Sequence, residues 1–542
     1  MKKFNKSIFI FRRDLRLNDN TGLINALEYS DHVYCLFVLD KNLFTSSHAY
    51  HAYSSFELPI QIKRLYNRYQ KRYHLLHFLK ESLIDLQIQF NQLDKSANKP
   101  PLPSDKDFRS KPIFANQNPK LLFLYGDPSL LINNILTSDN KIRAVFINRD
   151  YTPYSIKRDM SISRICKSKN VEFIESADNL LHEPEDILNS GNKPYKVFFQ
   201  YYTKAIQIPI KKVNNYDFSM HKDRLHSYNS KNKLENIDDE KRIIDLDQFF
   251  DPIISDHHQR SNIPLPGGRK GFTKMVSTLG NRLKNYKENK DIVEKKATSY
   301  LSAYLKFGLC SIREAFFIIH NELGEDHPLL RQLYWRDFFT YIGFHFPHVF
   351  VGPFQEKYRN ANNTVQWRND PKQFEMWCNG KTGFPIVDAG MRELNETGFM
   401  HNRARLITAS FLVKDLHIDW RYGERYFALK LVDYDPCINN GNWQWVASTG
   451  CDALPYFRTF NPWLQQKKID PESFYIKKWI SELRSVSKKL IHQWYKVNET
   501  DWYDNGYFQN SSEKNYKDLL IYPRPIIDHP TEMLVARELY RM

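Results

Sequence analysis

The densest group of side chains that could do chemistry lies between Thr382 and Pro462, where arginines, aromatic residues and paired Asn and Asp residues occur together. Asp435 directly precedes Pro436, which predicts a helix start with the Asp carboxylate as N-cap and Pro at the first helical position. Capping alone accounts for Asp435 and leaves Asp433 able to pair with an arginine. This mixture suits a pocket that holds a large, flat cofactor with polar edges beside a nucleic acid.

A second candidate is the helix expected to begin near Asn402. Arg403, Ile407 and Lys414 fall roughly on one side of it by helical spacing, so an apolar stripe with an arginine at its start could face a cavity. The alternative is a simple core helix with Arg403 and Arg405 in solvent.

Tryptophans form the third group. Trp443 and Trp445 lie two residues apart, so a helix points them to different sides, and one could face inward while the other lines a cavity. Trp367 and Trp420 are widely spaced, and by themselves such residues are ordinary core aromatics.

The bulk composition limits the partner and the compartment. Lys and Arg outnumber Asp and Glu by 78 to 62 in 542 residues, which favours an anionic partner such as nucleic acid or reflects a drift toward Lys. The six cysteines form no CxxC, so we expect reduced thiols, no metal site and an intracellular protein of the cytoplasm or nucleus. The apolar start meets Arg12 and Arg13 too early for a secretion signal, and no run is long enough to span a membrane.

The elements that must position these residues change character along the chain. Early apolar runs alternate with helical patterns, which predicts a parallel α/β sheet without a dinucleotide or P-loop fingerprint. The later half is dominated by helical periodicity and is expected to be all-α. The expected strands are Ser7–Phe11, His32–Leu39, Lys120–Tyr125 and Ala144–Asn148, with a helix over Thr21–Tyr29; the later helical stripes are Tyr300–Ile319, Leu329–Phe344 and Arg403–Trp420.

Polar, aperiodic stretches mark the boundaries. Residues 211–263 read as a long linker, and Lys95–Pro119 reads as an inserted surface loop. We expect an α/β domain over 1–180, an interdomain linker over 181–262 and an all-α domain over 263–542.

Several sequence blocks, in order and spacing, resemble the DNA photolyase/cryptochrome family, in its class I-like branch. They are FRRDLRLNDN near the N-terminus, TSYLSAYLKFG at Thr298–Gly308, LYWRDF around Tyr334, HNRARLITASFLVKDLHIDW at His401–Trp420 and NNGNWQWVASTGCDALPYFRTFNP at Asn439–Pro462. The resemblance implies a five-stranded, Rossmann-like parallel sheet in an antenna-binding domain, joined by a long linker to an all-α domain that binds FAD and DNA.

The resemblance also implies which residues hold FAD in a U shape. Arg405 and Asp433 would form an ion pair beside the flavin ring, Asp435 would meet its polar edge, and Asn439 would lie opposite its reactive nitrogen. The remaining cofactor contacts implied are Tyr286, Thr298, Ser299, Leu301, Ser302, Arg336 and Asn402.

The activity implied is light-driven DNA repair by a carbon–carbon lyase. Excited, reduced FAD would pass an electron to a cyclobutane pyrimidine dimer flipped out of damaged DNA, the ring would split, and the electron would return. Trp443, Trp420 and Trp367 match a chain that carries electrons from the surface to the flavin. The residues implied to contact DNA or the lesion are Gln332, Trp335, Asn402, Arg403, Leu406 and Trp445, with Trp335 and Trp445 as aromatic walls and with phosphate contacts from Arg403 and the face around Lys414.

Two positions depart from the class I pattern and leave alternatives open. Gln332 stands where these enzymes usually carry Glu and (6-4) photolyases carry Gln, whereas Leu406 replaces a Met and not the His that (6-4) chemistry needs. A (6-4) photolyase and a cryptochrome photoreceptor without repair activity are therefore alternatives to repair of cyclobutane dimers.

The antenna site departs as well. Tyr154 and Ser155 stand where folate-binding class I enzymes have Asn and Glu, which argues against a folate antenna and leaves a deazaflavin, a flavin or no second chromophore. We expect the protein to act as a monomer.

Overall fold

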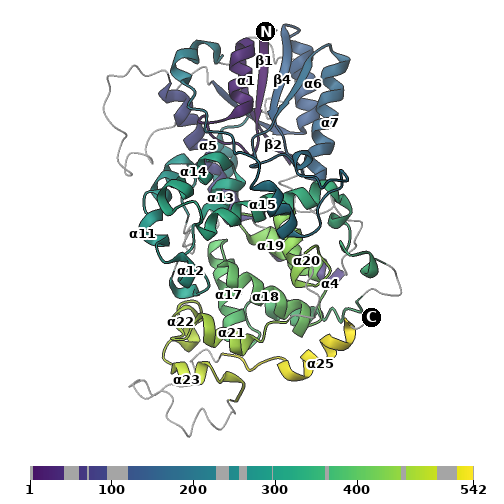
Figure 1. Ribbon diagram of the computed structural model, residues 1–542, viewed down its shortest axis with the longest axis vertical. Coiled ribbons are helices and arrows are strands. Elements are labelled where there is room, and N and C mark those ends of the chain that lie inside the picture. Colours follow the sequence, from purple (N-terminus) through teal and green to yellow (C-terminus); the bar gives the residue numbers. More distant parts are fainter. Residues whose placement is uncertain are drawn as a thin grey trace.

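A computed structural model describes most of the chain (Figure 1). The Lys95–Pro119 insertion and residues 227–242 and 255–262 of the expected linker lie outside the described residues. The described residues are 4–41, 60–69, 72–93, 120–226, 243–254, 265–295, 297–359, 365–452, 459–496 and 522–540.

The N-terminal part is built on one parallel sheet in the order β3-β2-β1-β4-β5. This confirms the predicted sheet and adds a fifth strand that the apolar runs alone did not locate. The elements are β1 (Phe4–Phe11), α1 (Thr21–Tyr29), β2 (Ser30–Asp40), β3 (Leu121–Gly126), β4 (Ile142–Asn148) and β5 (Glu172–Ser176).

Both faces of this sheet are covered. Phe9 and Phe11 of β1 pack in the core that includes Leu23 of α1, whereas Ile8 and Ile10 pack in the core that includes Leu131. Successive strand residues point to opposite faces, so the apolar run of β1 serves two helical layers. The flanking helices are α5 (Tyr73–Gln92), α6 (Pro128–Ser138) and α7 (Pro153–Ser168).

Below the sheet in Figure 1 the chain is helical, and the described residues after Ser176 contain no strand. The predicted all-α architecture is thus confirmed. The helices are α4 (Ile60–Tyr69), α8 (Phe198–Ala205), α9 (Leu246–Ile254), α10 (Gly268–Val276), α11 (Leu279–Leu283), α12 (Tyr286–Asn289), α13 (Leu301–Lys306), α14 (Ile312–Leu323), α15 (Pro328–His345), α16 (Pro371–Cys378), α17 (Pro385–Thr397), α18 (Asn402–Ser410), α19 (Trp420–Lys430), α20 (Pro436–Val446), α21 (Pro462–Ile469), α22 (Phe474–Trp479), α23 (Lys488–Ile491) and α25 (His529–Leu539).

Two predicted helical stripes are interrupted. The stripe at Tyr300–Ile319 breaks between α13 and α14, because Gly308 has a φ of +62° and a Cβ there would lie 2.0 Å from the carbonyl oxygen of Arg13. The stripe at Arg403–Trp420 changes from α18 to a π-helical turn, Phe411–Asp415, before α19 begins at Trp420.

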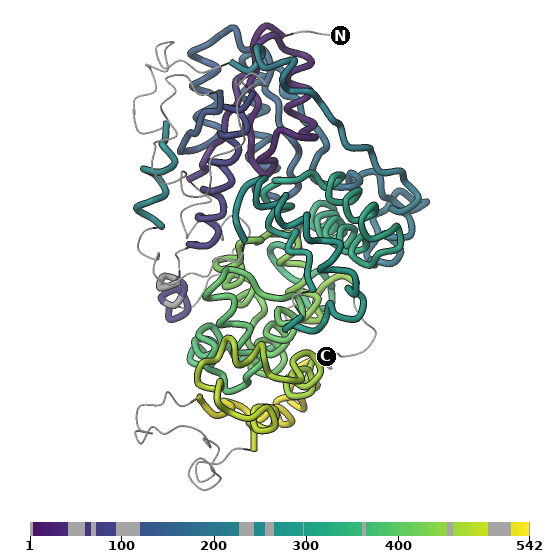
Figure 2. The backbone as a smooth tube through the Cα atoms, turned by 90° about the vertical axis from the view of Figure 1, so that its left-hand side faces the viewer, coloured from purple at the N-terminus to yellow at the C-terminus, as the bar shows by residue number. Residues whose placement is uncertain are grey.

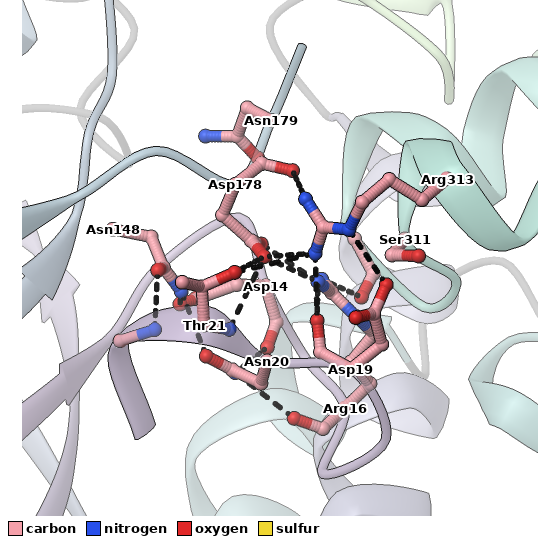
Figure 3. A network of polar contacts seen from close by, with 12 residues as sticks. Asp14, Arg16, Asp19, Asn20, Thr21, Asn148, Asp178, Asn179, Ser311 and Arg313 are labelled. Atoms are coloured by element: carbon pink, nitrogen blue, oxygen red, sulfur yellow. Dashed lines mark hydrogen bonds and ion pairs between the residues drawn. The ribbon is translucent and has the colours of Figure 1, made fainter. Parts of the chain in front are cut away.

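A buried charge network joins the sheet to the helical part (Figure 3). Arg16, in the loop after β1, donates to Asp178 at 2.7 Å, and Arg313 of α14 donates to Asp178 and to Asp19, each at 2.9 Å. Removing one partner of such a pair leaves an uncompensated buried charge, at a cost of roughly 3–5 kcal/mol. The network therefore fixes the loop after β1 against α14.

All six cysteines are buried and free. Among the described residues, no helix combines the length and the apolar character needed to cross a membrane.

Candidate functional site

A cavity of about 380 Å³ opens in the helical part, between α13, α15, α18 and α20. It brings together twelve of the residues that the sequence singled out, from segments more than a hundred residues apart. They are Ser299, Leu301, Ser302, Gln332, Trp335, Arg336, Asn402, Arg405, Leu406, Asp433, Asp435 and Trp445.

Helix starts set the positions of two walls. At α20, Oδ1 of Asp435 accepts hydrogen bonds from the backbone N–H groups of Cys437 and Ile438, as predicted for an N-cap. At α18, the ring of His401 accepts from the N–H of Arg403. Asn402 and Ile438, in the first turns of these two helices, line the cavity.

Asp433 offers an acceptor to whatever occupies this cavity. Arg405 donates to Oδ2 of Asp433 at 2.9 Å, which confirms the expected ion pair. Oδ1 of Asp433 is buried and has no hydrogen-bond partner among the described residues. A buried, unpartnered carboxylate oxygen is costly unless a ligand donates to it. The cavity therefore fits a ligand with N–H or O–H donors, as a flavin nucleotide has.

Asp435 carries a negative charge at the same wall. Burial by itself would raise its pKa, but the nearby Arg13, Lys306 and Arg336 outweigh burial and hold the pKa below its usual range. Arg13 also reaches Asp150, at 3.3 Å, so one guanidinium from the loop after β1 serves both carboxylates.

Aromatic and amide side chains also line the cavity, and they are more exposed than Asp433 and Asp435. Gln332 is exposed, and Trp335 and Trp445 are half-buried. Phe198 of α8 stacks on Trp335 with ring centroids 3.6 Å apart and planes at 8°. A half-buried, rigidly held indole beside an exposed amide suits stacking against a planar base.

Four of the residues predicted to contact the cofactor or DNA do not line this cavity, and neither do the three tryptophans of the predicted electron chain. Arg403 pairs with Asp291 at 2.6 Å, and Tyr286 is half-buried against the ring of His327. The others are Thr298, which is half-buried, and Asn439, which is 8% exposed. On α20 the cavity is lined by Ile438 and Asn442 instead.

Asn439 contacts a residue that the sequence did not reveal. Its amide nitrogen donates to the carbonyl oxygen and to Oε1 of Glu424, both at 3.0 Å. Burial raises the pKa of Glu424 to about 7, against the opposing hydrogen bond from Asn439 and the charge of Arg425. No motif marks Glu424; only the packing of α19 against α20 brings it to Asn439.

The three tryptophans of the proposed electron chain differ in exposure. Trp443 and Trp420 are buried, at 2% and 4% exposure, whereas Trp367 is partly exposed. The position of Lys414 differs from the one predicted from the sequence. It is fully buried, donates to Ser448 at 3.0 Å and lies over the ring of Tyr540, so the prediction that it contacts DNA phosphates is wrong.

A second cavity, of about 730 Å³, lies at the carboxyl ends of the parallel strands, where α/β sheets bind ligands. Tyr154 and Ser155 line it, among apolar side chains and several arginines. Lys306 lines both cavities, and burial together with Arg13 lowers its pKa to about 8. The segment from Tyr434 to Pro436 forms the wall between them.

Both the N-terminal and the C-terminal parts of the chain match known protein families. Residues 7–96 and 113–215 match the family model described as DNA photolyase, and residues 329–542 match the FAD binding domain of DNA photolyase. A deoxyribodipyrimidine photo-lyase of Alkalihalophilus pseudofirmus is 34% identical over 84% of this chain and 91% of its own length.

Solved structures agree along the whole chain. A Sulfolobus tokodaii photolyase with two FAD molecules is 31% identical, with a TM-score of 0.72 over 99% of both chains. A Synechocystis cryptochrome is 25% identical, with a TM-score of 0.74 over 99% of this chain and all of its own.

Proposed function

The chain belongs to the DNA photolyase family, and we propose that the lesion which it repairs with light and FAD is the cyclobutane pyrimidine dimer. The observation that carries this proposal is the cavity that joins the Arg405–Asp433 pair to the exposed Gln332 and the half-buried Trp335. The lining of this cavity combines charged side chains with aromatic ones.

Bound FAD, reduced and excited by light, supplies the electron that splits the dimer. We assign the diphosphate and sugars to the hydroxyls and backbone of Ser299, Leu301 and Ser302, since hydroxyls and N–H groups bind phosphate oxygens. Asp433, with its unpartnered oxygen, and Asp435 would receive donors from the ring edge. Arg336 and Asn402 complete the cofactor wall, with Tyr286, Thr298 and Asn439 near it.

At the open end, Trp335 and Trp445 would clamp the flipped dimer, and the Gln332 amide would hydrogen-bond a base edge. Leu406 would give an apolar contact, and Arg403 would contact phosphate. Trp367, Trp420 and Trp443 would pass an electron inward from the surface, in the order of their exposure.

The larger cavity is proposed as the site of a second chromophore. Its apolar lining and cationic side chains suit a planar, anionic heterocycle, which favours a flavin or a deazaflavin over a folate. The Sulfolobus tokodaii relative, described as holding two FAD molecules, supports the flavin option. Reconstitution with FMN followed by energy transfer to FAD tests it.

The proposed function also implies a domain organisation, an oligomeric state and a compartment. We take residues 1–180 as the antenna-binding domain, 181–262 as the linker and 263–542 as the FAD- and DNA-binding domain. We propose a monomer in the cytoplasm or nucleus, which light scattering and cell fractionation test.

Lesion-specific repair under light decides the function. Reduced protein is illuminated with oligothymidine that carries either cyclobutane dimers or (6-4) photoproducts, and each product is separated. Loss of only the cyclobutane dimers supports the proposal. Loss of only the (6-4) photoproducts, which Gln332 would favour, overturns the lesion assignment. Flavin binding without either repair indicates a photoreceptor.

A further inference from the structure

One lysine faces both cavities. Lys306, the last residue of α13, lines the candidate flavin cavity and also the larger cavity at the strand ends. Its side chain is half-buried and makes neither a hydrogen bond nor an ion pair with any of the described residues. A lysine in such a position is normally paired. The charge of Lys306 is therefore available to a ligand in either cavity.

Hydrogen bonds of the backbone hold Lys306 between the cavities. Its carbonyl oxygen accepts from Nε of Arg13 at 3.3 Å, and the carbonyl oxygen of Phe307 accepts from the N–H of Leu15 at 3.0 Å. These bonds join the end of α13 to the loop after β1, and in Figure 2 the purple N-terminal part lies above the green helices. The backbone is thus fixed, whereas the flexible four-carbon side chain can follow an anion into either cavity.

The other charges between the two cavities balance one another. Arg13 pairs with Asp435, which lines the flavin cavity, and with Asp150, which lines the larger cavity. Two carboxylates therefore neutralise Arg13. Lys306 differs from Arg13 because no described carboxylate pairs with it. An anionic ligand on either side of the segment Tyr434–Pro436 thus interacts with Lys306 at little cost to existing contacts.

The ligands proposed for the two cavities are both anions. Fully reduced flavin carries a negative charge on its ring near neutral pH, whereas the oxidised ring is neutral. The cationic lining of the larger cavity suits an anionic heterocycle. Reduction of the flavin therefore adds a second negative charge beside a single shared ammonium group, and two sites that share one charge are coupled in their binding free energies.

We propose that Lys306 couples the two cavities, because an anionic ligand in the larger cavity and the negative charge of the reduced flavin compete for its ammonium group. This rests on the proposed function, in which FAD fills the smaller cavity and an anionic heterocycle fills the larger one. The larger cavity then binds its ligand more weakly when FAD is reduced than when it is oxidised. By reciprocity, that ligand makes FAD harder to reduce.

The test uses FAD-loaded protein and deaza-FMN, a planar, anionic flavin analogue with carbon in place of the reactive ring nitrogen. Its low reduction potential keeps it oxidised beside reduced FAD. FAD is either left oxidised or reduced by light and a thiol without oxygen, and the probe is then added in the dark. Quenching of the probe's fluorescence gives Kd in each state. In wild-type protein, Kd is expected to rise about fivefold or more on reduction, as is ordinary for coupled sites.

Variants separate the shared charge from general charge. Lys306→Met is expected to lower the ratio of the two Kd values to less than about twofold, and Lys306→Arg should restore it. Arg158→Gln is the matched control, since Arg158 lines only the larger cavity and has a buried Nη2 without a hydrogen-bond partner among the described residues. This control should bind the probe more weakly in both states and keep the wild-type ratio.

Three results overturn the proposal. They are equal Kd values in both flavin states of wild-type protein, an unchanged ratio in the Lys306→Met variant, and an equal loss of the ratio in the Lys306→Met and Arg158→Gln variants. Absence of probe binding to wild-type protein removes the second chromophore and this coupling together. Failure of the proposed repair function looks different, because dimers then persist under light while the two Kd values can still be compared.

Discussion

Arg13 and Asp435 form a largely buried ion pair, in which the Arg13 side chain is 19% exposed, although they lie 422 residues apart in the chain. Arg13 comes from the loop after β1, and Asp435 caps α20 at the wall of the candidate flavin cavity. The same guanidinium reaches Asp150 in the second cavity. The N-terminal domain thus supplies a charge on which the cofactor wall of the helical domain depends.

Arg13→Met is expected to destabilise the protein by roughly 1–3 kcal/mol, because Asp435 and Asp150 lose the charge of Arg13 and retain that of Lys306. FAD retention should fall with it. Lys6→Met is the control, since the pair of Lys6 and Asp139 is partly exposed and is worth under about 1 kcal/mol. Urea unfolding and bound flavin per protein measure both variants. Equal losses in both would contradict a special role for Arg13.

The raised pKa of Glu424 predicts that the stability of the folded protein depends on pH. Its pKa in the folded protein is about 7, above the usual 4.5. Between pH 4.5 and 7 the Glu424 carboxyl group is protonated in the folded state and ionised in the unfolded state. The stabilisation of the folded state by this protonated group is therefore complete below about pH 4.5 and disappears as pH rises through 7. Wild-type stability relative to Glu424→Gln should therefore fall with rising pH, by up to roughly 3 kcal/mol.

Urea unfolding at pH values from 5 to 8.5 tests this difference. Glu472→Gln, at an exposed pair with Lys488, controls for the loss of a carboxylate. If the difference in stability between wild type and the Glu424→Gln variant stays constant across the range, Glu424 does not titrate there.

Trp443→Phe should slow light-driven reduction of the flavin about tenfold or more, which corresponds to at least roughly 1.4 kcal/mol of activation free energy. Repair by chemically reduced protein should remain close to wild type. Trp494→Phe, another buried tryptophan, which lies outside the proposed chain, is the control. Transient absorption after a light pulse measures the reduction rate. Normal reduction in the Trp443 variant would remove this residue from the electron path.

Gln332→Glu should raise the quantum yield for splitting cyclobutane dimers, because a carboxyl group can supply the acidic proton that an amide lacks. Gln332 is exposed, so the change should alter stability by less than about 0.5 kcal/mol. Gln332→Ala, which loses both hydrogen-bonding groups, should lower the yield. If the Glu variant gains nothing, the amide already fulfils this role.

The strands illustrate what periodicity can predict. The runs at Ser7–Phe11 and His32–Leu39 became β1 and β2 because apolar β-forming residues on a sheet covered on both faces leave a continuous local signal. β5, with its mixed residues Glu172–Ser176, carries no such signal and is defined by pairing with β4.

Lys414 illustrates where local pattern fails. Its helical spacing placed it on one side with Arg403, but the π-helical turn at Phe411–Asp415 shifts the register and buries it against Tyr540. The burial of Lys414 depends on Tyr540, at the end of the distant helix α25, and helical spacing within one segment cannot reveal that contact.

By itself the sequence determined the element types, the Asp435 cap and, through its motifs, many of the side chains that line the candidate flavin cavity. Only the tertiary structure decided that Arg13 pairs with Asp435, that Glu424 accepts hydrogen bonds from Asn439 and that Phe198 of α8 stacks on Trp335. Caps and periodicity are encoded within a few residues of one another, whereas these contacts join segments that meet only after the two halves of the chain pack together.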